Sequence, residues 1–161
     1  VGSLDKAKEV LSSFSGLEHR LELVRELGGV KYYDDSFATT PDTVIVALKA
    51  IIQPAVLILG GHDKRLDYEE LVDFIASTKD RVRHVITIGQ IGPQLAAMLR
   101  AKHFDHLSEN LTAMPEIVAE ARRVAQAGDA VLLSSGTSSF GLFKDYKDRG
   151  NQFKQAVLEL V

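Results

Sequence analysis

The chain has 161 residues, of which 45% are hydrophobic, and a formal net charge of -3 at pH 7. This length suits a single domain with its own hydrophobic core. The negative charge argues against a nucleic-acid-binding surface, and the absence of cysteine excludes disulfides, thiolate metal sites and a cysteine nucleophile. No apolar run approaches the ~20 residues of a membrane span, and no signal-peptide layout opens the chain, so we expect a cytoplasmic protein.

The first fifty residues predict a helix or linker, a hairpin and a second helix. Residues 5–14 carry apolar side chains at helical spacing. Residues 19–24 and 30–33 flank a Gly-Gly pair, which tolerates positive φ and therefore predicts a β-hairpin. Thr40 before Pro41 is typical of an N-cap followed by proline in the first turn, so a buried helix is expected to begin there.

The stretch at residues 55–65 is the most informative in the chain. An apolar run over residues 55–59 ends at Gly60 and Gly61, and polar residues follow. This pattern indicates a fully buried strand that leads into a surface loop. Ligands of open α/β sheets bind outside the carboxyl ends of the strands, so we expect chemistry at this exit.

The rest of the chain alternates between helical and strand patterns. A capping-box spacing at residues 67–70 and a Gly-Pro pair at 92–93 each predict a helix start, and a helix over residues 114–125 is expected to end at Gly128. A last helix is expected through Phe153. The predicted strands are at residues 82–88, 103–107 and 130–133. The alternation predicts a Rossmann-like three-layer α/β domain, with about six mostly parallel strands, one antiparallel edge strand and helices on both faces.

Three predicted strands end in loops rich in small or hydroxyl residues, at residues 34–40, 60–65 and 134–139, and we call these the exit loops. Parallel strands place them on one edge of the sheet. Their hydroxyls and N–H groups, with Lys64, would suit a carboxylate or phosphate, whereas the aspartates of the first loop would accept hydrogen bonds from a ribose or an amine. Each serine or threonine could equally be an ordinary loop or capping residue.

Sharper motifs fail on inspection. The segment from Gly136 to Gly141 lacks the lysine and hydroxyl that a phosphate-binding loop needs, and Phe140 occupies the second glycine of a serine-hydrolase elbow. His103 and His106 have no third metal ligand in view. We therefore expect no P-loop, no serine hydrolase and no metal site.

Four ordered motifs resemble those of the C-terminal domain of Mur ligases. They are Gly16-Leu17-Glu18-His19-Arg20, the segment from Asp34 to Thr40, the segment from Leu59 to Lys64, and residues 132–139 with Phe143-Lys144 and Arg149-Gly150-Asn151-Gln152-Phe153. The resemblance covers residues 16–161, while residues 1–15 resemble the end of the preceding ATPase domain or its linker. Within the family, the chain is most similar to members that add D-glutamate.

The resemblance implies an ATP-dependent ligase that joins D-glutamate to UDP-N-acetylmuramoyl-L-alanine through an acyl phosphate in peptidoglycan synthesis. ATP and Mg²⁺ would be bound mainly by a central domain that this chain lacks and would contact. The domain alone is therefore expected to be inactive, and a monomer is expected. Two alternatives stay open: a stand-alone α/β anion-binding module, or a ligase of the same family that adds another amino acid.

The resemblance also implies roles for individual residues, although it assigns no catalytic residue to this domain. It implies ATP contacts at His19, Arg20 and Asp35, and D-glutamate contacts at Thr39, Lys64, Ser139, Phe140 and Tyr146. Without the resemblance, Arg20 would be interpreted as a surface charge, Ser139 as a helix cap and Tyr146 as a core aromatic. One departure concerns Phe37, which stands where the family commonly carries lysine.

Overall fold

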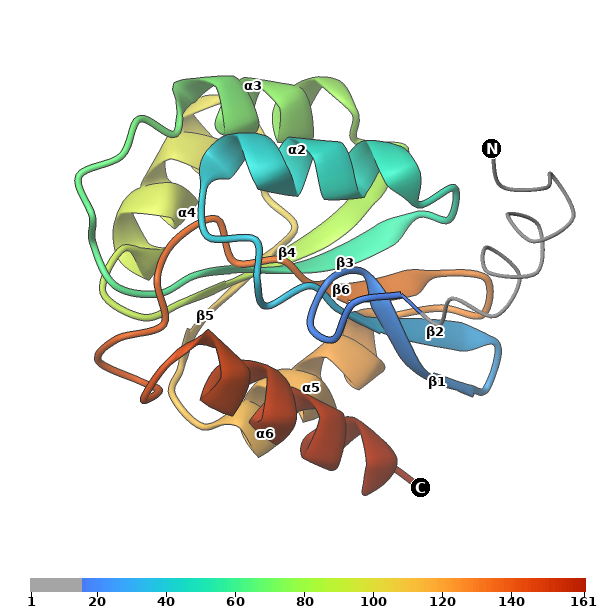
Figure 1. Cartoon of the computed structure of the whole chain (residues 1–161). Coiled ribbons are helices and arrows are strands. Elements are labelled where there is room, and N and C mark those ends of the chain that lie inside the picture. Colours follow the sequence, from blue (N-terminus) through green and yellow to red (C-terminus); the bar gives the residue numbers. More distant parts are fainter. Residues whose placement is uncertain (1–15) are drawn as a thin grey trace, which may run out of the picture.

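The computed structural model describes residues 16–161, and the helix predicted at residues 5–14 lies outside that part. Six strands form one sheet in the order β1-β2-β6-β3-β4-β5 (Figure 1). The strands are β1 (Glu22–Leu27), β2 (Val30–Asp34), β3 (Ala55–Gly60), β4 (Val82–Ile88), β5 (Leu107–Leu111) and β6 (Ala130–Leu133). Only β1 runs antiparallel to its neighbour within this described sheet, which confirms the predicted architecture.

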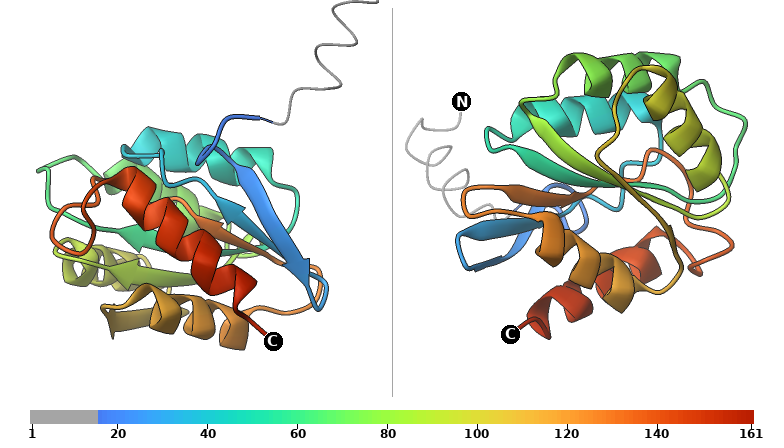
Figure 2. Two further views of the ribbon diagram at one scale, coloured as in Figure 1. Left: turned by 60° about the horizontal axis from the view of Figure 1, so that its bottom comes forward. Right: turned by 180° about the vertical axis from the view of Figure 1, so that it is seen from behind.

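Helices cover both faces of the sheet, as Figure 1 and the rear view in Figure 2 show. One face carries α2 (Pro41–Ala50), α3 (Glu69–Ser77) and α4 (Gly92–Ala101). The other face carries α5 (Met114–Val124) and α6 (Tyr146–Leu158). Within the described residues, no helix has the length and hydrophobicity that a membrane crossing requires.

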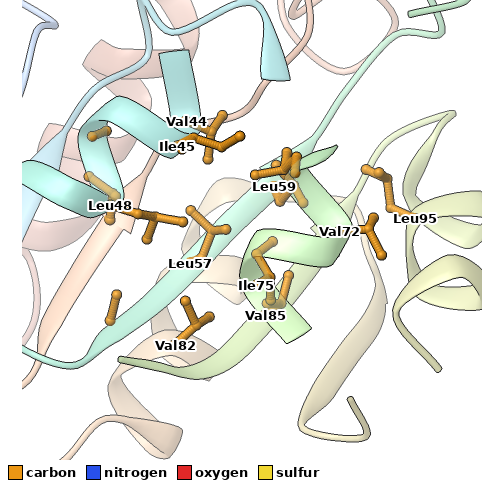
Figure 3. Packing of buried hydrophobic residues seen from close by; sticks show 14 of the residues in the cluster. Val44, Ile45, Leu48, Leu57, Leu59, Val72, Ile75, Val82, Val85 and Leu95 are labelled. Carbon is orange, nitrogen blue, oxygen red and sulfur yellow. The ribbon is translucent and has the colours of Figure 1, made fainter. Parts of the chain in front are cut away.

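Strand β3 is the centre of the core because every residue in it is buried. Leu57 and Leu59 point to the layer of α2, α3 and α4, where Figure 3 shows them among Val44 and Ile75, whereas Ile58 packs on the opposite side. A strand covered on both faces needs apolar residues at every position, which explains the unbroken run. Burial of each valine, leucine or isoleucine side chain in this strand contributes about 1.5–3 kcal/mol.

The N-termini of α2 and α3 can be compared with the capping residues predicted from the sequence. Thr40 precedes α2 as predicted, and its carbonyl accepts a hydrogen bond from the Thr43 hydroxyl at 2.6 Å. The capping box at residues 67–70 is only partly correct, because Tyr68 is the N-cap residue and its side chain makes no cap. Asp67 instead accepts from the N–H of Glu69 at 2.9 Å.

The strand predicted at residues 103–107 was wrong, because β5 begins where that prediction ends. His103 has φ 58° and lies in the turn after α4, and Phe104 is a buried side chain of the core. The apolar residues that suggested a strand therefore close the end of a helix.

The predicted end of α5 was also wrong. The helix stops at Val124, and the N–H of Ala125 donates to Ala121 O at 3.0 Å. Gly128, with φ 96°, belongs instead to the turn before β6, where its N–H donates to Gly29 O at 2.8 Å. The glycine thus joins this turn to the hairpin.

Candidate functional site

The exit loops meet at one edge of the sheet, as predicted. Strand β6 lies between β2 and β3, so the three loops leave neighbouring strands. Gly136 N–H donates to Ala38 O at 3.0 Å, and His62 N–H donates to Ser138 O at 2.9 Å. The loop after β6 is therefore hydrogen-bonded to both of the others.

This edge is a topological switch point. The helices that follow β2 and β3 pack on one face of the sheet, whereas α6, which follows β6, packs on the other (Figure 1). Open α/β sheets bind ligands where the loops of neighbouring strands diverge in this way. The exit loops lie at that position.

Several hydroxyls of the exit loops are used inside the protein. Thr137 donates to His62 O at 2.6 Å, and Ser36 donates to the backbone oxygen of Tyr146 at 2.7 Å. The expectation that the loop hydroxyls would face an anion was therefore wrong for these two. They hold the loops in place instead.

Sequence reasoning missed the residue that ties the site together, Arg149 of α6. Its side chain is fully buried, and its guanidinium donates to Ser36 Oγ at 2.9 Å, to Ser36 O at 2.8 Å and to Thr137 O at 3.3 Å. Burial lowers the pKa of Arg149 to about 10, so the group remains charged at neutral pH. One sequence signal was its place in the motif Arg149-Gly150-Asn151-Gln152-Phe153.

Asp35 lies at the end of β2 with 4% of its surface exposed. It accepts hydrogen bonds from the Ser134 hydroxyl at 2.7 Å and from Leu21 N–H at 3.1 Å. Burial raises the pKa of Asp35 to about 6, although both hydrogen bonds oppose the shift. The residue lines a cavity of about 300 Å³ together with Arg20 and Thr43, so it is placed beside a space that a ligand could enter.

His19 is buried and bonded to a neighbouring carboxylate, and it is also one of the residues that line a cavity of about 290 Å³. Only 2% of it is exposed, and its Nδ1 lies 2.7 Å from Asp34 Oδ2. Gly150 packs against this pair, since a Cβ there would lie 2.6 Å from Asp34 Oδ2. The arrangement favours a positioning role for His19.

His19, Glu22 and Asp34 form a group whose ligand atoms all lie within 4.8 Å of one another. The group is already satisfied, because His19 is bonded to Asp34 and the Lys154 ammonium lies 3.3 Å from Glu22 Oε2. A second cation would be repelled there. We assign no metal to it.

Arg20, Phe37 and Tyr146 pack together beside the exit loops. The Arg20 guanidinium lies 5.0 Å from the centroid of the Phe37 ring, and that ring meets Tyr146 edge to face at 5.0 Å. All three line a cavity of about 290 Å³. The unusual Phe37 thus supplies a platform for Arg20, a cation–π contact that a lysine could not make.

The remaining predicted residues lie on the exit loops and just beyond them. Lys64 is exposed and makes no hydrogen bond or ion pair with residues 16–161, and Thr39 is half-buried. Ser139 is 3% exposed, and its carbonyl accepts from Phe143 N–H at 3.1 Å. Phe140 is 58% exposed, so its ring is available at the surface.

Residues 19–136 match the family model described as Mur ligase, glutamate ligase domain. The chain belongs to this family. The match confirms the resemblance inferred from the four motifs, and it includes the first two exit loops and the start of the third.

Two relatives of this Mur ligase domain share the same name. The chain is 39% identical over 159 residues to a UDP-N-acetylmuramoylalanine--D-glutamate ligase of Acetivibrio thermocellus, which covers 95% of this chain and 34% of that protein. It is 40% identical over 156 residues to the protein of the same name from Geotalea daltonii, covering 97% and 33%. The chain therefore spans about a third of the length of these relatives.

Solved structures confirm the fold. UDP-N-acetylmuramate-alanine ligase MurC of Thermotoga maritima matches with a TM-score of 0.65 at 16% identity, over 98% of this chain and 34% of that one. MurF ligase of the same organism, solved in complex with ADP, matches with a TM-score of 0.60 at 14% identity, over 92% and 33%. The Mur ligase domain described above thus has the same Rossmann-like architecture.

Proposed function

We propose that this chain is the amino-acid-binding domain of a ligase that adds D-glutamate to UDP-N-acetylmuramoyl-L-alanine in the cytoplasm. The identity of 39% to a relative of that name, over 95% of this chain, carries the proposal. The arrangement of the exit loops supports this proposal. These loops carry Thr39, Lys64 and Ser139, and all three loops lie at one edge of the sheet.

The proposed reaction has two steps. The γ-phosphoryl group of ATP passes to the carboxylate of the substrate, which gives an acyl phosphate and ADP. The neutral amine of D-glutamate then attacks the acyl carbon and forms the C–N bond. The tetrahedral intermediate loses a proton from nitrogen to a base and expels phosphate as the C–O bond breaks, which leaves an amide. Negative charge is present on the phosphoryl oxygens throughout, so fixed positive charge beside them accelerates the reaction.

Arg20 is the residue we assign to the phosphates. Its guanidinium is exposed, lies 5.0 Å from the centroid of the Phe37 ring and makes no hydrogen bond with residues 16–161. Its donors can therefore form charge-assisted hydrogen bonds with phosphate. His19 positions the segment that carries it. Asp35 would accept a hydrogen bond from a ribose hydroxyl, and its ionised form, dominant above its pKa of about 6, is the stronger acceptor.

Lys64 is the residue we assign to a carboxylate of D-glutamate. It stands on the loop after β3 with no competing partner among residues 16–161. Thr39 and Ser139 would add contacts from the neighbouring loops, and Phe140 and Tyr146 would flank the amino acid. The Mg²⁺ that accompanies ATP is assigned to the part of the enzyme outside this chain, because the described acidic group at His19 is satisfied internally.

A coupled ADP-release assay tests the proposal on the ligase assembled with the preceding domains. D-glutamate should support turnover, whereas L-glutamate, L-alanine and diaminopimelate should not, and this chain alone should release no ADP. Turnover of ATP by the chain alone would refute the assignment. Turnover with another amino acid in place of D-glutamate would identify the protein as a different ligase of the family. Anion binding without any ligation would identify the chain as a stand-alone binding module.

A further inference from the structure

A further cavity lies at the carboxyl ends of β4 and β5, beside the exit loops but centred on other strands. Its volume is about 430 Å³, within the ~300–1,000 Å³ typical of small-molecule sites. The helix after β4 packs on one face of the sheet and the helix after β5 on the other (Figure 2). The cavity therefore occupies a second topological switch point, the position at which α/β sheets bind ligands.

The backbone is irregular at this point. Ile86 pairs with Ser108 but Ile88 pairs with Leu111, so two residues of β5 face Thr87 alone. One of those two is Asn110, whose φ of 65° lies in the left-handed region. Bulges of this kind interrupt the ladder of backbone hydrogen bonds and often occur beside sites, where they redirect side chains. Here Glu109 and Asn110, the two residues of the bulge, both line the cavity.

Thr87 is one of the residues that line the cavity, and 2% of its surface is exposed. Its hydroxyl has no hydrogen-bond partner among the described residues. Buried hydroxyls are almost always partnered, so one left without a partner beside a cavity indicates a group that a ligand brings. This observation is independent of the bulge and of the topology.

The remaining lining carries hydrogen-bonding groups and little charge. Glu109 is neutralised by an ion pair with Arg100. Gln90 accepts from Asp63 N–H through Oε1 at 3.1 Å, which leaves its NH₂ group as a donor. The other titratable side chain in the lining is that of His62, and its ring packs edge to face against Phe140. An ionic ligand would find no unpaired carboxylate or ammonium here.

We propose that this cavity, the β4–β5 cavity, binds an uncharged planar group that carries an N–H donor beside a C=O acceptor, as a carboxamide or a pyrimidine base does. Such a group matches the free donor of Gln90, the amide of Asn110 and the hydroxyl of Thr87, and its flat face suits the exposed ring of Phe140. Phe140 is the single residue that the cavity shares with the predicted glutamate contacts. The site does not depend on the proposed ligase reaction.

The test uses the isotope-labelled chain and follows its backbone amide shifts by NMR. Nicotinamide and uridine are titrated as uncharged probes, with inorganic phosphate and D-glutamate as charged controls. We expect shifts at Thr87, Gln90 and Asn110 with an uncharged probe. A response to nicotinamide alone identifies a carboxamide site, and a response to uridine alone identifies a pyrimidine site.

Two threonine variants separate binding from stability. Thr87→Val should weaken probe binding by about 3- to 10-fold without lowering the thermal midpoint, because no hydrogen bond is lost in the free protein. Thr78→Val is the matched control, since its hydroxyl donates to Phe74 O at 2.7 Å; it should lower the midpoint and leave binding unchanged. The exposed Thr112→Val provides a second lining variant, and it should weaken binding in a fully folded protein.

The proposal is overturned if neither uncharged probe shifts these amides at millimolar concentration, or if Thr112→Val and Thr87→Val both bind as the wild type does. It is also overturned if phosphate or D-glutamate shifts them instead. In the D-glutamate case the cavity would belong to the amino-acid site of the proposed ligase. Loss of ligase activity in the assembled enzyme, by contrast, would leave these binding results unaffected.

Discussion

The guanidinium of Arg149 donates to both the hydroxyl and the carbonyl oxygen of Ser36, although the two residues are 113 positions apart in the chain. The same group reaches Thr137 O. One side chain of α6 therefore fixes the loop after β2 and the loop after β6 relative to each other.

Arg149→Lys should lower the free energy of unfolding by about 1–3 kcal/mol, because an ammonium group keeps the charge but cannot reproduce the planar fork of donors. Urea titration followed by circular dichroism measures the change. Arg123→Lys is the control, since Arg123 pairs with Glu120 on the surface and should change stability by less than about 0.5 kcal/mol. Equal effects of the two substitutions would contradict the role given to Arg149.

Asp35 should make the domain less stable as the pH rises from about 4 to 6. Its folded-state pKa of about 6 lies above its ordinary value of 3.8, so the folded state holds a proton that the unfolded state has released in this interval. The contribution of Asp35 to the free energy of unfolding is complete below pH 3.8 and is lost as the pH rises past about 6. The total loss is about 2–3 kcal/mol.

Unfolding titrations at a series of pH values test this, with Asp35→Asn as the variant. Asparagine keeps a hydrogen-bonding side chain without the ionisation, so the decline between about pH 4 and pH 6 should disappear. Asp105→Asn, at an exposed position, should leave the decline in place. A wild-type profile that is flat in this interval would show that the pKa of Asp35 is not raised.

Lys64→Ala should raise the KM for D-glutamate by about 10- to 100-fold in the assembled ligase and leave the KM for ATP nearly unchanged, because a charge-assisted contact to the amino acid is lost. Steady-state kinetics with each substrate varied in turn measure the two constants. Lys102→Ala removes a lysine that pairs with Asp73 and should alter neither. An unchanged KM for D-glutamate would remove Lys64 from the site.

Arg20→Ala should reduce kcat by about 100-fold or more, because its positive charge is needed where phosphoryl charge is transferred. Phe37→Leu should reduce kcat only about 2- to 5-fold, since it removes the platform beneath the guanidinium but not the charge. Single-turnover rates of the assembled ligase separate this step from product release. A larger loss in Phe37→Leu than in Arg20→Ala would mean that the aromatic ring itself contacts a substrate.

The fold was largely predictable because its signals are local. The buried run of β3 and the proline that follows Thr40 each determine an element over a few residues. The strand β5 was misplaced because its sequence Leu-Ser-Glu-Asn-Leu has little apolar alternation and contains the bulge at Asn110. The position of a bulge depends on pairing with β4, which a single segment does not reveal.

The site was predictable at the level of loops and not of side chains. The three exits were found from their composition, but a buried arginine in a helix looks like a surface arginine until its partners are known. The partners of Arg149 are backbone oxygens far away in the sequence. Gly150 could have indicated that this part of α6 is closely packed, because glycine destabilises the interior of a helix and is usually kept there for a packing reason. Here His19 and Asp34 leave no space for a Cβ atom at this position.

The hydrogen bonds that join the exit loops also affect how tightly a ligand can be held. Flexible loops lose conformational entropy when they close on a ligand, and that loss subtracts from affinity. Here the loops lose this freedom when the domain folds, since backbone groups such as His62 N–H and Ser138 O already bond to each other. This edge of the sheet is therefore preorganised, so a ligand bound there would lose little affinity to the ordering of loops.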